Sequence, residues 1–90
     1  MDKKIAIDIA QTSLLYIIEK EEEFYKFIDI SGTNIDNIRD SFIDELFLCS
    51  VMEYILNWEP LLLKISAEKN IAGEDFQRAF ISLGGKPLNY

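Results

Sequence analysis

One pattern of residues occurs twice in this chain of 90 residues, with the two copies 38 positions apart. Residues 16–43 and residues 54–81 share six identities, and most of their remaining apolar positions match in kind. The identical pairs are Tyr16/Tyr54, Ile17/Ile55, Glu21/Glu59, Lys26/Lys64, Phe42/Phe80 and Ile43/Ile81. A repeat of this length is typical of a supersecondary unit that buries its apolar face only by stacking on a copy of itself. The repeat therefore predicts a domain built from two similar halves, over about residues 10–43 and 48–83.

The spacing of apolar residues along the chain predicts an all-α fold. About six helices, three in each half, are expected to form one compact bundle over residues 1–85, and residues 86–90 are expected to form a loosely held tail. The first and fourth helices are interpreted as the long inner members, because no single face holds all of their apolar residues. Whether this apolar surplus is core or interface stays open. The expected helices cover about residues 3–19, 22–31, 35–43, 44–57, 60–69 and 73–83.

Two residues predict matching helix ends. Gly32 follows the second expected helix, and Asn70 stands at the same position of the second copy. Glycine tolerates the left-handed backbone that ends many helices, and asparagine is the next best residue for it. This match therefore concerns a backbone requirement and not only hydrophobicity. At the helix starts, the expected N-caps are Asp2, then Thr33 or Asn34, and later Asn57 or Glu59.

The composition argues against several classes of function. The chain has no His, the commonest general acid/base and metal ligand, and its single Cys cannot form an internal disulfide. The formal net charge of −7 and the scattered nine Lys and Arg residues argue against binding to nucleic acid or to an anionic membrane. No apolar run approaches the roughly 20 residues of a membrane span, and no signal peptide is recognised, so we expect a cytoplasmic protein.

No pattern of catalytic or metal-ligating residues stands out, and we expect no enzyme activity, no cofactor and no metal. The acidic run Glu19–Glu23 is interpreted as a solvated turn, since successive residues point in different directions. Residues 29–40 partly match a calcium-binding loop, but Asn34 stands where the turn needs Gly, and Asp40 where the loop needs Glu. A helix end followed by an N-cap explains that segment better. Cys49 lies among acidic neighbours in the most apolar helix, which indicates a buried, inert thiol.

Two aromatic residues are the candidates for a partner-binding site. Trp58 stands at the break after the fourth expected helix, and Tyr54 lies one helical turn before it. Trp58 either packs this turn onto the core or serves as an exposed anchor for a partner, because tryptophan is enriched among the residues that dominate binding energy. In the second case Tyr54 belongs to the same patch.

The order of these segments resembles a known family. An acidic turn is followed by FYKFIDISGTN, a central FLCSVMEYILNWEPLLL, a short turn and a last helix that ends in LGG. Over about residues 10–85 this order resembles the small alphaproteobacterial proteins known as domain of unknown function 3572. Trp58 stands where that family usually has Asp, and Ile35 and Gly73 stand where it has Pro, which concerns capping more than fold. The resemblance implies an all-helical cytoplasmic protein and offers no activity, ligand or catalytic residue.

These observations favour a protein-interaction or adaptor module, because the surplus apolar surface of the first and fourth helices needs a cover. The expected partner is another, unknown protein or a second copy of the chain in a homodimer. The alternative is a small-molecule or metal-binding protein with a pocket between the two helical halves. A third alternative is an acidic mimic of nucleic acid that occupies a basic protein.

Overall fold

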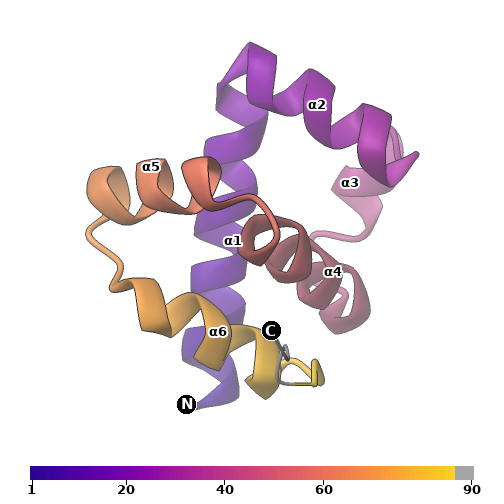
Figure 1. Cartoon of the computed structure of the whole chain (residues 1–90). Helices are drawn as coiled ribbons and strands as arrows, with labels where there is room; N and C mark the ends of the chain where they lie inside the picture. The colour runs from indigo at the N-terminus through magenta and orange to yellow at the C-terminus, as the bar shows by residue number, and fades with distance from the viewer. Residues whose placement is uncertain (87–90) are drawn as a thin grey trace.

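The computed structural model describes residues 1–86, and in this range the chain folds into six α-helices without a strand (Figure 1). This confirms the predicted all-α fold. The bounds lie within one residue of the expected ones, except that the third helix ends at Asp40 instead of Ile43. Of the predicted tail over residues 86–90, only Lys86 belongs to the described residues. The helices are α1 (Lys3–Glu19), α2 (Glu21–Ser31), α3 (Ile35–Asp40), α4 (Glu45–Leu56), α5 (Glu59–Lys69) and α6 (Gly73–Ser82).

α3 ends in a tightened turn, and a long-range hydrogen bond holds the segment after it. The Ser41 N–H bonds the carbonyls of Asn37 and Ile38, which tightens the last turn. Beyond this turn the Phe42 carbonyl accepts a hydrogen bond from Gln11 Nε2 of α1 at 3.0 Å. A long-range bond thus ties the segment after α3 to a distant helix.

Two helix starts, those of α1 and α3, are capped by side chains that the sequence predicts. Asp2 accepts from the Lys4 N–H at 3.2 Å, and Asn34 accepts from the Asn37 N–H at 2.9 Å. The prediction that Asn57 or Glu59 caps α5 was wrong, because the N-cap is Trp58 and makes no side-chain hydrogen bond there. The first turn of α5 contains a proline, which has no N–H and so leaves one donor fewer in need of a cap.

The two predicted left-handed helix ends are confirmed. Gly32 follows α2 with φ of 72°, and Asn70 follows α5 with φ of 59°. Asn70 is the one non-glycine residue with positive φ among residues 1–86. Both residues allow the chain to turn sharply from one helix into the next.

α1 is the central helix, and α4, the other helix expected as an inner member, packs beside it. α2, α4, α5 and α6 all pack on it, and α4 also packs on α5 and α6 (Figure 1). Together they enclose one apolar core. Its buried side chains are Ala6, Ile9, Ala10, Leu14, Tyr16, Ile17, Phe27, Ile38, Leu48, Val51, Met52, Ile55, Leu61, Ile65, Phe76, Ala79, Phe80 and Leu83.

The segment of α2 and α3 is the loosest part of the described fold. The backbone of α2 packs on α1 alone, and the backbone of α3 packs on no other helix. Side chains make the connection instead, since Phe27 of α2 and Ile38 of α3 are both only 2 % exposed. Buried side chains, and not close packing of helix backbones, therefore connect α2 and α3 to the rest of the fold.

The predicted repeat is visible in the helix boundaries. α2 and α5 begin and end at positions 38 residues apart, and α3 and α6 begin 38 residues apart. The side chain of Gln11 donates to the Phe42 carbonyl, and Cys49 Sγ donates to the Phe80 carbonyl, which are corresponding pairs of the two copies. The packing of the copies differs, because α6 packs on α1, α4 and α5 whereas α3 packs on no helix. The structural equivalence of the two halves thus stays a prediction.

Candidate functional site

A groove lies between α2 and α4. It consists of two adjoining hollows with cavity volumes of about 500 and about 310 Å³. Both are lined by Ile30, Tyr54 and Asn57. We call the two together the α2/α4 groove. The larger hollow is further lined by Phe27, Ser31, Thr33, Phe47, Ser50 and Glu53, and the smaller one by Lys26 and Trp58.

Helical periodicity brings these side chains together. On α2, residues spaced by three and four positions share one face, so Lys26, Phe27 and Ile30 all turn toward α4. On α4 the same spacing presents Phe47 and Tyr54. The Phe27 ring meets the Tyr54 ring edge to face with centroids 5.1 Å apart, and meets the Phe47 ring at 6.5 Å. These three rings form an aromatic floor.

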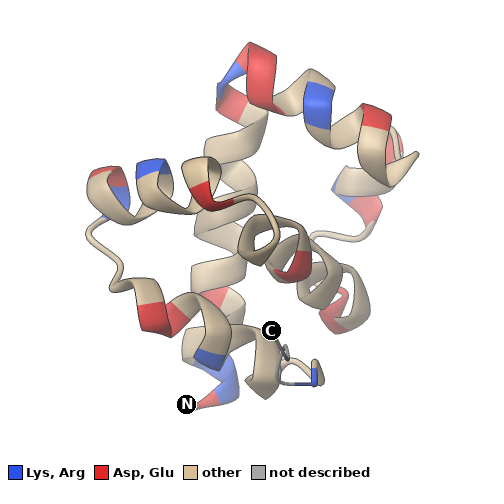
Figure 2. Cartoon of the chain, viewed as in Figure 1, with Lys and Arg blue, Asp and Glu red and all other residues tan. Residues whose placement is uncertain are grey.

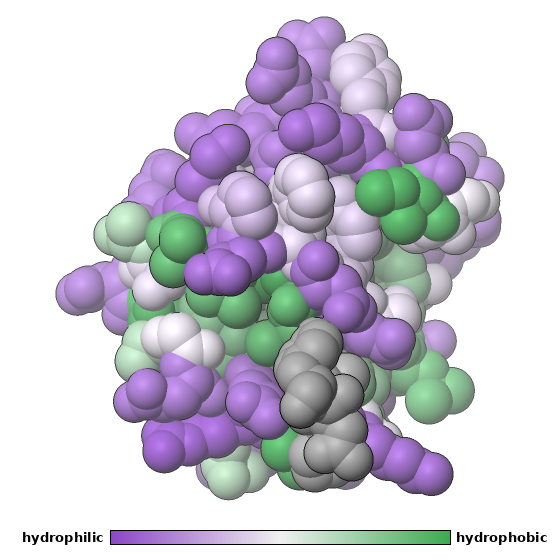
Figure 3. All heavy atoms as spheres, viewed as in Figure 1, coloured by the Kyte–Doolittle hydropathy of each residue, from purple (hydrophilic) through white to green (hydrophobic). Residues whose placement is uncertain are grey.

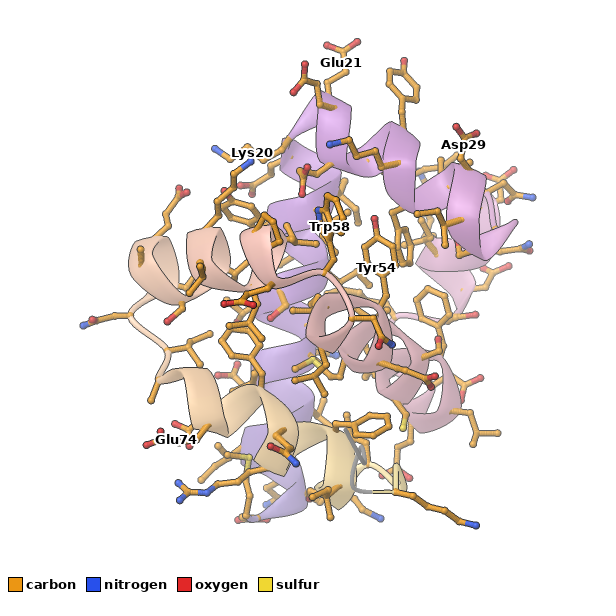
Figure 4. The ribbon with its side chains drawn as sticks, viewed as in Figure 1. Lys20, Glu21, Asp29, Tyr54, Trp58 and Glu74 are labelled. Carbon is orange, nitrogen blue, oxygen red and sulfur yellow. The ribbon has the colours of Figure 1, made fainter. Side chains whose placement is uncertain are left out.

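The structure brings Tyr54 and Trp58, the two residues singled out from the sequence, to the smaller hollow. In Figure 4 both rise from the end of α4 and the turn after it toward α2. Trp58 is 44 % exposed, so its ring is only partly packed onto the protein. Ile30, which is 71 % exposed at the opposite wall, was not among the residues predicted from the sequence. The sequence contained a signal for this residue, because Ile30 is a large apolar residue that lies outside the face by which its helix is expected to pack on the core.

Glu23 is the most unusual charged residue beside the groove. Its side chain is buried, one of its oxygens lies 3.7 Å from Lys26 Nζ, and the other, Oε2, has no hydrogen-bond partner. The interpretation of the whole acidic run as a solvated turn was therefore wrong at this residue. α2 already begins at Glu21, which places Glu23 one turn before Phe27 on the inward face.

Cations lie close to the aromatic rings of this region. Lys26 Nζ lies 5.8 Å from the centroid of the Trp58 ring while it pairs with Glu23. Behind the groove, Lys20 Nζ lies 5.2 Å from the centroid of the Tyr16 ring. Lys26 thus links the wall formed by α2 to the wall formed by the turn before α5.

Burial and negative charge also affect the phenol groups. Burial raises the pKa of Tyr54, and the charge of Glu23 raises it further. Burial raises the pKa of Tyr16 as well, and the charges of Glu68 and then Glu23 add to it. Both hydroxyls therefore stay neutral over the physiological pH range and can donate a hydrogen bond.

Neither the thiol nor the carboxylates form a reactive or metal-holding arrangement in the described part of the chain. Cys49 was predicted to be buried, but it is only half-buried. Burial is the larger cause that raises the pKa of its thiol, and the charge of Glu53 is the smaller one. A raised pKa keeps a thiol protonated and unreactive. Among residues 1–86, no three His, Cys, Asp or Glu side chains come together as a metal site.

A further hollow, of about 250 Å³, lies elsewhere on the described surface and is lined by Leu15, Ile18, Ile35, Ile38, Arg39 and Phe42. Lys and Arg are spread over several helices and are not gathered on one face (Figure 2). Hydrophilic residues follow the upper edge of the molecule, with paler and apolar residues below them (Figure 3). In the described range no single helix has the length and hydropathy to cross a membrane. α4 and α5 meet that test only as a pair, with a bend of 107° between them.

Comparison with known proteins identifies the family of the chain. Neither the curated proteins nor the solved structures give a match. A family model described as a protein of unknown function (DUF3572) matches residues 3–86, a range that includes all six helices and both walls of the α2/α4 groove. The chain therefore belongs to this family of unknown function, as its resemblance to domain of unknown function 3572 indicated.

Proposed function

We propose that this protein is a protein-interaction module and that the α2/α4 groove is its docking surface. The observation that carries the proposal is an aromatic groove between two helices whose backbones do not pack on each other. One of its walls carries Ile30, which is 71 % exposed, and the other carries Trp58. Apolar side chains at such positions gain stability when a partner covers them.

The dimensions of the groove suit a helical partner. The α4 wall extends from Phe47 to Asn57, which corresponds to about 15 Å along a helix axis. A partner helix of about three turns covers this length and inserts apolar residues spaced by three and four positions. Full burial of Ile30 on binding contributes on the order of 1–2 kcal/mol, since most of its side chain is exposed in the free protein. Trp58 is of the residue type that most often dominates such interfaces.

Site-specific photo-crosslinking in the native host tests this docking surface. A photoreactive residue at Ser50, which is exposed and lines the larger hollow, is expected to form one defined adduct. The same residue at Ala67, exposed on α5 and outside the groove, serves as the control. The Ser50 adduct should disappear in an Ile30→Asp variant. Equal adducts from both positions, or an adduct that persists with Asp at position 30, would contradict the proposal.

A second candidate function is the binding of a small molecule. The larger hollow, at about 500 Å³, falls within the volume range of small-molecule sites and is lined by α2 from the first half and α4 from the second. Substitution Ser50→Trp is expected to fill this hollow. A ligand that raises the melting temperature of the parent protein but not of this variant would support the second function.

We also propose that the fold is built from two copies of one three-helix unit. The common boundaries of α2 and α5, the left-handed ends at Gly32 and Asn70, and the corresponding hydrogen bonds to Phe42 and Phe80 support this. The two units differ most in their last helices, because α6 is packed and α3 is not. A crystal structure in which residues 16–43 fail to superpose on residues 54–81 would exclude a common unit.

A further inference from the structure

The α2/α4 groove lies where the two copies of the repeat pack differently. A shift of 38 positions relates the pair α2 and α4 to the pair α5 and α1. α5 packs directly on α1, whereas α2 does not pack on α4. The groove is therefore the open counterpart of a closed contact within the same chain.

One substitution between the copies explains much of this difference. On α5, Leu61 and Ile65 are fully buried. The corresponding residues of α2 are Glu23 and Phe27, so a carboxylate stands where α5 has a fully buried leucine. A charged group resists burial between apolar surfaces unless it is paired. The buried Oε2 of Glu23 has no partner, which leaves its pairing incomplete.

A second difference concerns the cation beside the tyrosine. In the first copy, residues 16–43, Lys20 Nζ lies 5.2 Å from the centroid of the Tyr16 ring. Tyr54 is the counterpart of Tyr16, but Trp58 occupies the position of Lys20. The second copy, residues 54–81, thus places two aromatic rings at the smaller hollow. The cation beside the Trp58 ring is Lys26, which comes from the α2 wall.

From this comparison we propose that the groove selects a basic amphipathic helix of a partner protein. One Lys or Arg of that helix enters the smaller hollow between Tyr54 and Trp58 and pairs with Glu23. This inference rests on the proposed docking function and names the chemistry of the partner. The smaller hollow offers a cation the faces of two aromatic rings. The incompletely paired carboxylate of Glu23 does not line the hollow itself, but it is joined to it through its ion pair with Lys26, which does.

Charge around the groove agrees with this partner. Glu53 lines the larger hollow on the side of α4 and is exposed. Lys26 is the one basic residue among the lining residues, and its charge is already offset by Glu23. The chain as a whole carries a formal net charge of −7. A helix with basic residues beside its apolar face therefore meets complementary charge along the groove.

Lys26 occupies the place that the partner's cation takes. Its side chain is 54 % exposed, and its ammonium group contacts both Glu23 and the Trp58 ring. On binding, Lys26 swings into solvent and the incoming cation replaces it. Lys26 thus competes with the partner, and its removal is expected to strengthen binding.

Titration with synthetic helical peptides tests this charge selectivity. The probes are a 14-residue amphipathic peptide of Leu and Lys, and its counterparts in which Gln or Glu replaces every Lys. Trp58 is the single tryptophan of the chain, so its fluorescence reports directly on the groove. The Lys peptide is expected to bind at least about tenfold more tightly than the Gln peptide, and the Glu peptide more weakly still. Added salt should reduce the difference.

Variants with matched controls locate the effect. Glu23→Gln is expected to weaken binding of the Lys peptide by about tenfold, whereas Glu21→Gln, at an exposed residue of the same helix, has little effect. Lys26→Met should strengthen binding several-fold. Lys64→Met removes the same charge at the corresponding exposed position of the other copy, outside the groove. Far-ultraviolet circular dichroism verifies that each variant is folded.

The outcomes separate this inference from the proposed function. If the Lys and Gln peptides bind equally well, or if Lys26→Met and Lys64→Met act alike, cation selectivity is refuted while the docking groove stands. Peptide binding that Ile30→Asp leaves unchanged places the peptides elsewhere and refutes this inference as well. If sedimentation shows a concentration-dependent dimer that Ile30→Asp dissociates, the occupant is a second copy and the basic partner is wrong. A parent protein that gives no Ser50-specific crosslink, by contrast, contradicts the docking function itself.

Discussion

The rings of Phe27 and Tyr54 meet edge to face with their centroids 5.1 Å apart, and this contact joins α2 to α4. It connects the first half of the chain to the second between helices whose backbones do not pack on each other. Phe27 additionally contacts Phe47. The position of α2, and with it the width of the groove, therefore depends on a small number of aromatic contacts.

Substitution Phe27→Ala is expected to lower the free energy of unfolding by about 3–5 kcal/mol, because Phe27 is buried and little else can fill its place. Urea unfolding followed by circular dichroism measures this loss. Tyr25→Ala is the control on the same helix. Tyr25 is 59 % exposed, so its removal should change stability by less than about 0.5 kcal/mol. Similar losses in both variants would show that Phe27 does not hold α2 in place.

Substitution Glu23→Leu is expected to stabilise the fold by about 1 kcal/mol. It removes a buried oxygen without a partner, and its former ion-pair partner Lys26 can return to water. It also restores the residue that the other copy has at Leu61. The midpoint of urea unfolding should rise for Glu23→Leu and stay nearly constant for Glu21→Leu. A fall in the midpoint would mean that the pair with Lys26 stabilises more than its burial costs.

Alkaline pH is expected to destabilise the fold partly through Tyr54. Its pKa is raised in the folded protein by burial and then by Glu23. A raised folded pKa gives a stabilisation that is fully present below the unfolded pKa of about 10 and is lost as pH rises through the folded value. Tyr54→Phe keeps the ring and removes this contribution, so the free energy of unfolding should fall less steeply above about pH 10. Tyr25→Phe is the control, and an identical fall in both variants would contradict the role of Tyr54.

The left-handed end of α2 gives a prediction that involves the backbone alone. An added Cβ meets no atom within 4 Å at Gly32 or at Gly73, but Gly32 has φ of 72°. Gly32→Ala should therefore cost about 1–2 kcal/mol of stability. Gly73→Ala, at the start of α6, should gain up to about 1 kcal/mol because alanine loses less backbone entropy on folding. Thermal unfolding of the two variants should shift in opposite directions, and shifts in one direction would refute the argument.

Local features of the fold could be predicted because they depend on neighbours in the sequence. The apolar spacing places the helices to within one residue at most ends. Gly32 and Asn70 mark helix ends because few residues adopt the left-handed backbone. Asp2 and Asn34 cap helices because their short side chains reach the N–H groups of the first turn. Tyr54 and Trp58 could be assigned to one patch because they are one helical turn apart.

Features that depend on distant elements could not be predicted in this way. The segment after α3 is held by a hydrogen bond from Gln11 to the Phe42 carbonyl, 31 residues further along the chain. Asn57 and Glu59 have the chemistry of N-caps, yet neither caps α5. Glu23 looks like one more solvated acid in an acidic run, yet the tertiary structure buries it.

The sequence by itself determined an all-α chain, its helix boundaries and a 38-residue pattern, because helix propensity, capping and apolar period are short-range properties. Only the tertiary structure decided that α6 packs into the core while α3 does not, and that α2 stands apart from α4. Both copies carry similar apolar patterns, so the pattern alone cannot distinguish the closed contact of α5 and α1 from the open groove of α2 and α4. The distinction arises from which side chains meet across the fold, with Leu61 fully buried in one copy and Glu23 incompletely paired in the other.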